Sequence, residues 1–177
     1  MGTSTMRVMG VAAVMAVAVF GFAGLGLAGG PLDPRVKTVV TTTQDVDSSG
    51  VPKLLVEVEL MQMLEGGASP VVPPGGVKLV LEQHWPNSVN PSGWVTVQGS
   101  ERSPTVLPDC LDGCNLGSEL GSRVDVADND YNPLCTNIDA KANAIRAVAV
   151  VTVSNAQAGK PKNFLGRSVS IANPCKG

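Results

Sequence analysis

Four cysteines are the residues of this chain whose chemistry the sequence indicates most directly. In an exported chain, an even number of cysteines is typical of disulfide pairs. Of the three connectivities, we favour Cys110–Cys114 with Cys135–Cys175, because the second bridge would tie the carboxyl-terminal end to the body of the domain. A zinc site of four thiolates is the alternative, but the paired short spacings of zinc ribbons are missing.

The segment 45–50 has oxygen-bearing side chains at the spacing of a calcium loop. Asp45 and Asp47 take the first and third positions, and Gly50 takes the sixth, where such a loop turns sharply. The twelfth position needs a bidentate glutamate but is Val56. Because aspartate, serine and glycine are also ordinary turn residues, we interpret this segment as a turn, with a Ca²⁺ site as the alternative.

A second acidic segment contains Asp128 and Asp130, with Asp139 at the twelfth position counted from Asp128. Pro133 stands where a calcium loop needs glycine. We therefore favour a solvated acidic loop, although Ca²⁺ also accepts carboxylates from loops without a helical frame. We expect no other metal or cofactor.

The residues that usually carry catalysis are sparse. His84 is the only histidine, so a multi-histidine metal site is excluded. The sequence contains no G-x-S-x-G, H-E-x-x-H or P-loop motif. We expect a protein that is not an enzyme. A secreted hydrolase that uses paired carboxylates is a minor alternative, since the sequence does not fix the separation of its acidic groups.

Three aromatic residues, Trp85, Trp94 and Tyr131, are candidates for contact with a partner. The two tryptophans frame the segment 86–93 and are expected to pack across a hairpin. Exposure to a partner or to a membrane interface is the alternative, because tryptophan is enriched at both.

Residues 8–32 carry no charged side chain, and about 20 apolar residues suffice to cross a bilayer. The small residues at 26–28 would suit a signal peptidase, but the apolar part exceeds the usual signal core of about 7–15 residues. We favour a transmembrane anchor over residues 1–32, with a cleaved signal peptide as the alternative. In both cases the remainder lies in the periplasm or the extracellular space.

The charge balance of the chain argues against nucleic acid as a partner. The sequence has 13 Lys and Arg residues against 15 Asp and Glu residues, a formal net charge of −2. Nucleic-acid binding needs a basic patch that neutralises phosphates.

The elements that must position these residues are predicted to be strands. Residues 56–60 alternate apolar and acidic side chains, the pattern of a half-buried strand, and residues 148–153 are apolar enough for a strand buried on both faces. The segment 99–143 lacks such patterns and is predicted to be an irregular insertion, with a short helix near 137–144. Strands are predicted at residues 35–43, 53–63, 77–85, 94–98, 144–154 and 167–172.

This pattern predicts an all-β fold for residues 33–177, a disulfide-tied β-sandwich that is Ig-like or similarly antiparallel, preceded by one membrane helix. The first functional hypothesis is a non-catalytic, membrane-anchored accessory subunit that docks on a larger membrane protein complex, in a respiratory, photosynthetic or envelope assembly. The alternative is a secreted or surface-exposed adhesive or filament subunit that pairs through a strand edge.

Overall fold

The computed structural model describes residues 36–176, apart from gaps at 67–68, 87–91 and 155–160. The chain divides into two compact units, Met1–Gly30 and Pro31–Gly177. The first unit, and with it the predicted membrane segment 1–32, lies outside the described residues. Within the described part of the second unit, no helix is long and apolar enough to cross a membrane.

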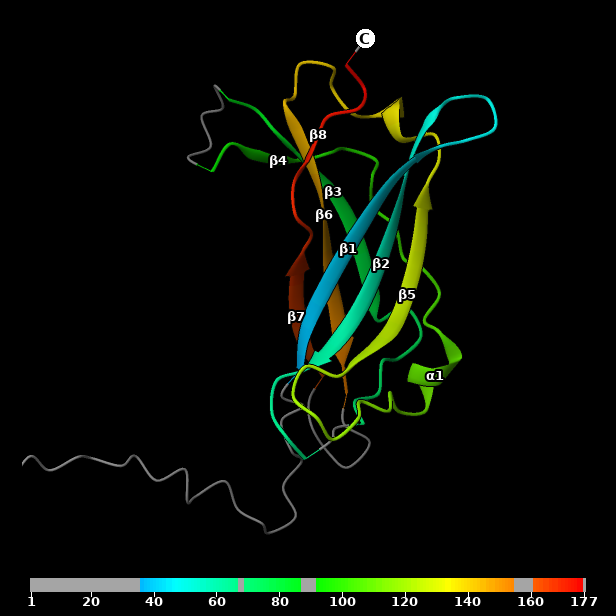
Figure 1. The fold of residues 1–177 in the computed structure, drawn as a ribbon, viewed down its shortest axis with the longest axis vertical. Coiled ribbons are helices and arrows are strands. Elements are labelled where there is room, and N and C mark those ends of the chain that lie inside the picture. The colour runs from blue at the N-terminus through cyan, green and yellow to red at the C-terminus, as the bar shows by residue number, and fades with distance from the viewer. Residues whose placement is uncertain (1–35, 67–68, 87–91, 155–160, 177) are drawn as a thin grey trace, which may run out of the picture. The chain divides into compact units, whose positions relative to one another are not determined.

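The described residues form two antiparallel sheets (Figure 1). The smaller sheet has the order β1-β2-β5, and the larger sheet has the order β4-β3-β6-β7, with β8 also paired to β6. Two short helical turns, α1 and η1, precede and follow β5. The bounds are β1 Val36–Val46, β2 Pro52–Gln62, β3 Val77–His84, β4 Trp94–Thr96, α1 Pro108–Leu111, β5 Arg123–Tyr131, η1 Leu134–Thr136, β6 Ala144–Val153, β7 Lys162–Arg167 and β8 Ile171–Ala172.

Strands form where the sequence alternates or is uniformly apolar. In β2 the side chains of Val56, Val58 and Leu60 are buried, whereas that of Glu57 is exposed. The apolar strand β6 pairs with β3 on one side and with β7 on the other, so it is an inner strand of the larger sheet. The strand predicted from alternation in β2 is confirmed, and so is the strand predicted from apolar character in β6. The expectation that β6 is buried on both faces is wrong, because Val150 and Thr152 on its outer face are only half-buried.

The prediction of an irregular insertion over residues 99–143 is wrong for β5, which completes the smaller sheet. The physical reason is a shift in register between Val58 and Glu59, opposite Ala127 and Asp125. At this bulge Val126 and Ala127 are both buried, so the period-two pattern that marks a strand is interrupted. The short helix expected near 137–144 is also absent, and the nearest helical turn is η1.

The predicted position of the carboxyl-terminal strand is also wrong. Residues 167–172 were expected to form one strand, but the chain forms β7 before them and the two-residue strand β8 at their end. The sequence does not predict a strand at Lys162–Arg167, because its polar and apolar residues do not alternate regularly. Only Gly166 of this segment is buried.

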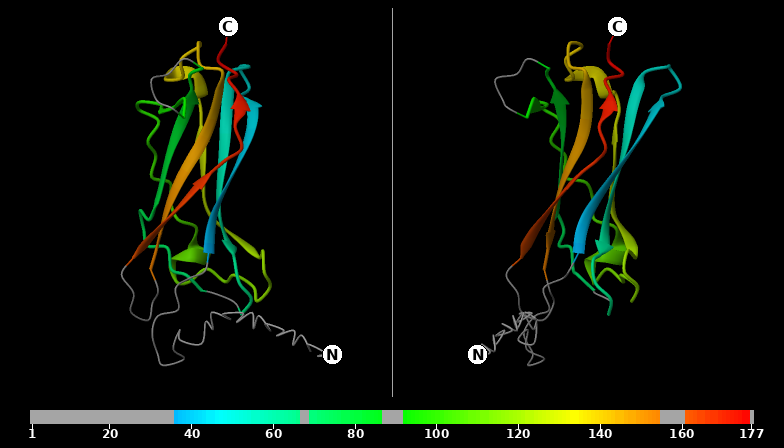
Figure 2. Two further views of the ribbon diagram at one scale, coloured as in Figure 1. Left: turned by 90° about the vertical axis from the view of Figure 1, so that its left-hand side faces the viewer. Right: turned by 60° about the vertical axis from the view of Figure 1, so that its left-hand side comes forward.

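Buried side chains of the two sheets belong to one hydrophobic cluster. Leu54 and Leu60 of β2 belong to it together with Leu79 of β3 and Ile145 of β6, and none of these four is more than 1% exposed. Figure 2 shows β1, β2 and β5 as one group of neighbouring strands and β3, β6 and β7 as another. Burying each such side chain contributes about 1.5–3 kcal/mol.

The sheets meet closely where β1 passes β7. Thr38 donates a hydrogen bond from Oγ1 to the carbonyl oxygen of Phe164 at 3.0 Å, and Gln44 donates from Nε2 to that of Ala172 at 3.3 Å. At Gly166 a Cβ atom would lie 2.8 Å from the Thr38 carbonyl oxygen. Glycine at this position therefore lets the two backbones approach each other.

Candidate functional site

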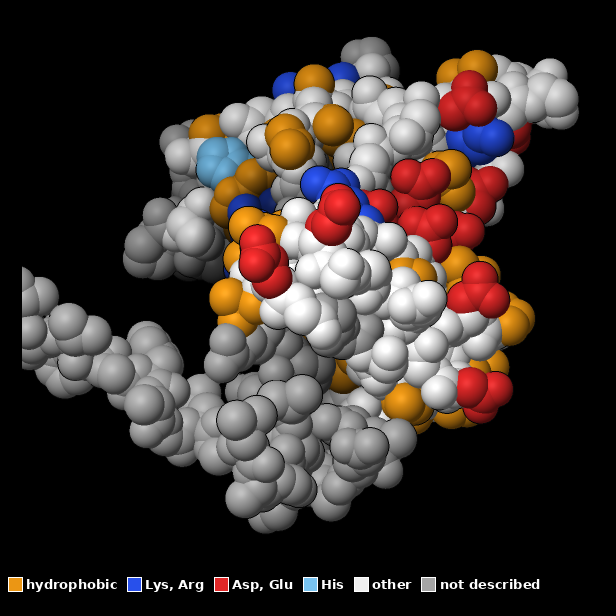
Figure 3. All heavy atoms as spheres, turned by 60° about the horizontal axis from the view of Figure 1, so that its bottom comes forward, with side chains coloured by type: hydrophobic (Ala, Val, Ile, Leu, Met, Phe, Trp, Pro, Cys, Tyr) orange, Lys and Arg blue, Asp and Glu red, His pale blue; other side chains and the backbone are white. Residues whose placement is uncertain are grey.

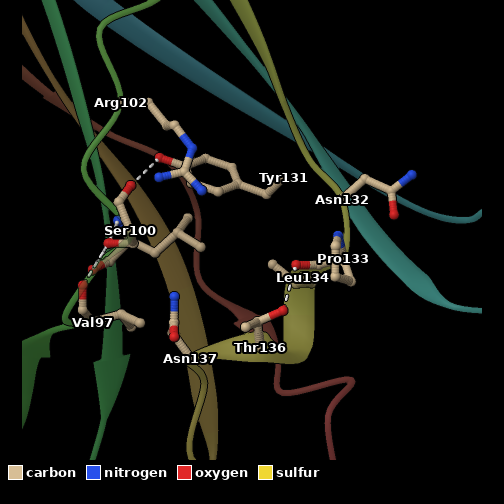
Figure 4. Close-up of a pocket in the computed structure, with 10 residues that line it drawn as sticks. Val97, Ser100, Arg102, Tyr131, Asn132, Pro133, Leu134, Thr136 and Asn137 are labelled. Carbon is tan, nitrogen blue, oxygen red and sulfur yellow. Dashed lines mark hydrogen bonds between the residues drawn. The ribbon is translucent and has the colours of Figure 1, made fainter.

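A pocket of about 120 Å³ lies where β5 ends (Figure 4). Three separate segments line it: Leu81 of β3, the loop 97–102 that follows β4, and residues 131–137. Apolar side chains, including Leu81 and Leu134, line part of it, and polar groups line the rest. Among the described residues that line this pocket, Arg102 is the only charged one.

Tyr131 forms a wall of this pocket and is only 4% exposed. Its hydroxyl group donates a hydrogen bond to the carbonyl oxygen of Ser100 at 3.0 Å. Burial raises the pKa of Tyr131 to about 12, because an ionised phenolate would lose its hydration, while the nearby charge of Arg102 acts in the opposite direction. The ring is therefore neutral throughout the physiological range.

Ser100 joins the loop 97–102 to the larger sheet. Its hydroxyl oxygen accepts a hydrogen bond from the backbone amide of Leu81 at 2.9 Å and donates one to the carbonyl oxygen of Val97 at 2.6 Å. With Tyr131 bonded to the Ser100 carbonyl, this loop is held from both β3 and β5. One wall of the pocket is thus fixed by buried hydrogen bonds.

Arg102 stands at the rim, with its guanidinium carbon 5.3 Å from the centre of the Tyr131 ring, a cation–π contact. Its backbone amide and carbonyl both pair with Leu79 at 2.9 Å. Its Nη1 donates to the carbonyl oxygens of Gly99 at 3.1 Å and Glu101 at 2.8 Å. The position of the cation is therefore set by its own backbone and by the Tyr131 ring.

The opposite wall is held covalently. Cys135, in η1, forms a disulfide with Cys175, and Cys110 forms a disulfide with Cys114. The connectivity favoured from the sequence is thus the one present. Next to Cys175, Asn173 donates from Nδ2 to the carbonyl oxygens of Asp139 and Ala142, both at 2.9 Å, which fixes the loop that continues this wall.

A second constellation lies on the outer face of the larger sheet. The guanidinium of Arg146 lies 4.0 Å from the centre of the Trp94 ring and forms an ion pair with Glu82 at 2.6 Å. His84 contacts Trp94 edge-on at 5.1 Å between ring centres, and its Nδ1 lies 2.7 Å from Oδ1 of Asn143. Aromatic, cationic and anionic groups are thus held together on this face, where their side chains are half-buried.

The structure corrects the expected pairing of the tryptophans. The register between β3 and β4 places His84, and not Trp85, opposite Trp94. The backbone amide of Trp85 donates to the carbonyl oxygen of Gly93 at 2.8 Å, which closes the loop. The sequence also missed Arg146, whose role depends on strand pairing.

The first acidic segment has the contacts of a hairpin turn. Oδ1 of Asp47 accepts hydrogen bonds from the backbone amides of Ser49 at 2.8 Å and Val51 at 2.9 Å. The Val46 amide donates to Asp45, and this bond, with the nearby charge of Lys53, holds the pKa of Asp45 below its usual value. These contacts support the turn interpretation.

The structure does not bring the second set of acidic candidates together. Asp128 and Asp130 lie along β5, whereas Asp139 lies in the loop after η1, where its Oδ1 accepts from the Lys141 amide at 2.7 Å. In the part of the chain that the structure describes, no three His, Cys, Asp or Glu side chains are grouped to hold a metal ion.

Comparisons with known proteins add no assignment. The chain matches no protein family, no curated protein and no solved structure. The features that bear on its function are therefore the pocket, the two outer sheet faces and the disulfides.

Tyr131 gives a direct test of the pocket's structure, because it is the only tyrosine of the chain. Its phenolate absorbance is expected to appear with a midpoint at about pH 12 in the folded protein and at 10.0 in denaturant. Because the folded state holds this proton more tightly, stability is unaffected below pH 10 and falls between pH 10 and 12. A midpoint near 10 in protein that is still folded by circular dichroism would contradict the burial, and Tyr131→Phe should lose this pH dependence.

Proposed function

We propose that this chain is a non-catalytic accessory subunit that docks on a protein partner of a membrane assembly outside the cytoplasm. Residues 1–32 would anchor it in the membrane. The two disulfides indicate an oxidising compartment. We further propose that the two sheets form an Ig-like β-sandwich, and their shared hydrophobic cluster supports this arrangement.

The observation that carries the docking proposal is the composition of the outer face of the larger sheet. Arg146 is held there between Trp94 and Glu82. Tryptophan and arginine are the residue types that most often dominate binding energy at protein interfaces. Because the contacts to Trp94 and Glu82 already fix the guanidinium, a partner would lose little side-chain entropy in meeting it.

An apolar band continues this face beyond Arg146. Val80 of β3 pairs with Val148 of β6, and Val150 of β6 pairs with Leu165 of β7. The side chain of Leu165 points away from the core and is 50% exposed, although leucine is among the residue types most often buried. Val80 and Val150 are half-buried, whereas Val148 is only 6% exposed and is not counted as part of the surface. We define Val80, Val150 and Leu165 with Trp94 and Arg146 as the docking face. An apolar band beside an aromatic–arginine pair fits a flat protein surface better than a small solute.

The docking face can be tested with two matched substitutions in the full-length protein, purified in mild detergent. Leu165→Asp places a charge on this face without entering the core, and Leu120→Asp makes the same change at a residue that is 65% exposed elsewhere. We expect a defined partner to co-purify with the unmodified chain and with L120D, and to be lost with L165D. If the full-length protein runs alone in mild detergent, or if L165D retains the partner, the docking proposal fails.

A second candidate function is a filament or surface subunit, and the opposite sheet face favours it. On the smaller sheet, Glu57 stands directly opposite Asp128. Glu59 stands opposite Asp125 but forms an ion pair with Arg123 at 3.1 Å. Figure 3 shows a group of acidic side chains on the visible face of the molecule. Like charges placed opposite each other destabilise a sheet, so a basic surface of a neighbouring copy would reduce the repulsion between Glu57 and Asp128.

The mass and oligomeric state of the mature protein separate the two candidates. Retention of residues 1–28 with one partner chain supports the anchored subunit. Loss of those residues with salt-sensitive self-association supports the filament, because contacts between exposed charges are screened by salt.

A further inference from the structure

We propose that the pocket beside Tyr131 binds a carboxylate that carries a small apolar group. This pocket is separate from the docking face, and the proposal of a carboxylate site does not depend on the docking proposal. The same chemistry is offered by the carboxyl terminus of a peptide that ends in a residue such as alanine and by a free small organic acid.

The charge of the pocket favours an anion. Arg102 is the only charged residue among the described residues that line it. Its Nη1 is occupied by the carbonyl oxygens of Gly99 and Glu101, whereas its Nε and Nη2 have no protein acceptor among the described residues. These two nitrogens form an edge with two parallel N–H groups, which matches the two oxygens of a carboxylate.

A second donor faces the same space. Figure 4 shows the Asn137 side chain standing in the pocket, with its nitrogen end directed toward the side where Ser100 and Arg102 lie. The hydroxyl of Thr136 is turned toward the carbonyl oxygen of Pro133, 3.5 Å away. An amide donor opposite the guanidinium would fix the orientation of a bound carboxylate.

The size and the lining of the pocket limit the rest of the ligand. A volume of about 120 Å³ holds only a few heavy atoms. Leu81, Val97 and Leu134 line it beside the Tyr131 ring. These surfaces offer no hydrogen bonds to a fully polar anion such as phosphate, but they suit a methyl or isopropyl group next to the carboxylate.

The pocket is also built before any ligand arrives. One wall is held by the buried hydrogen bonds of Ser100 with Leu81 and Tyr131, and the other is held by the Cys135–Cys175 disulfide. A ligand that enters fixed walls does not have to order them, so even a small ligand can bind measurably.

The test is nuclear magnetic resonance titration of the full chain in detergent micelles with N-acetylalanine and with N-acetylalaninamide, which differ only at the carboxylate. We expect N-acetylalanine to shift the signals of Gly99, Arg102 and Asn137 with roughly millimolar affinity. The amide should bind at least tenfold more weakly. Equal affinity of acid and amide would overturn the proposal, as would binding of inorganic phosphate with equal or higher affinity.

Variants assign the binding to this pocket. Arg102→Gln should weaken N-acetylalanine binding at least tenfold, and Arg167→Gln, which removes an exposed cation from β7, should leave it unchanged. Should R102Q fail to fold, Asn137→Ala provides an independent test and should weaken binding severalfold. Unchanged binding in a folded R102Q, or in N137A where R102Q does not fold, overturns the proposal.

Two further probes identify the source of the carboxylate. A tetra-alanine peptide with a free carboxyl terminus that binds at least tenfold more tightly than acetate indicates a peptide end. Similar affinities for the two indicate a free small acid. Both results support a carboxylate site, and failure of both probes to bind overturns it.

Discussion

Replacing Val151 with aspartate is expected to leave the domain unfolded. Val151 is fully buried in β6, where it pairs with Val77 of β3 and with Phe164 of β7. A carboxylate at this position would have no counter-charge, and its burial would cost several kcal/mol. Because small domains are stable by only about 5–15 kcal/mol, that cost is comparable to the whole stability.

The matched control is Val169→Asp, which makes the same change at a residue that is 83% exposed. Circular dichroism and thermal melting should show a folded V169D with the melting temperature of the unmodified protein. A cooperative transition at the normal temperature in V151D would show that β6 is not the buried strand described above.

Removing the Cys135–Cys175 bridge is expected to cost more stability than removing the Cys110–Cys114 bridge. The two cysteines of the first bridge are 40 residues apart in the sequence, and those of the second are 4 apart. In the chain-entropy description, closing the longer loop restrains the unfolded chain more, which gives about 4 kcal/mol against about 2 kcal/mol.

Urea denaturation of the two double-alanine variants measures this difference without leaving a free thiol. The variant that lacks Cys135 and Cys175 should have the lower midpoint. It should also lose N-acetylalanine binding at urea concentrations where it is still folded, because a wall of the pocket is no longer held. A lower midpoint for the variant that lacks Cys110 and Cys114 would contradict the entropic argument.

Local pattern was enough to predict most of the strands. The alternation around Val56 and Val58 predicted β2, and the apolar run that contains Val151 predicted β6. The strand β5 was missed because its bulge places the buried residues Val126 and Ala127 side by side, and a pattern of period two does not survive an inserted residue. Strand prediction from one sequence therefore fails where the pairing itself is irregular.

The candidate site was predicted less well, because its residues meet through the topology and not through local spacing. Tyr131 was named as a candidate, but its partner Ser100 lies 31 residues earlier in the chain. The contact between Trp94 and Arg146 joins β4 and β6 through the intervening strand β3. Which strands become neighbours depends on the whole fold, so a single sequence does not show these contacts.

The strand β1 sets the distance between the two ends of the domain. The strand begins at Val36 at one end of the sheets, and Gln44 near its other end bonds to Ala172, close to the carboxyl terminus (Figure 1). Eleven residues of extended chain span about 35 Å. The end of the domain that carries the Cys135–Cys175 bridge therefore lies about 35 Å from Val36, where the described chain begins. If residues 1–32 anchor the protein as proposed, inserting or deleting residues before Val36 would change the distance of that end from the membrane without altering any binding surface.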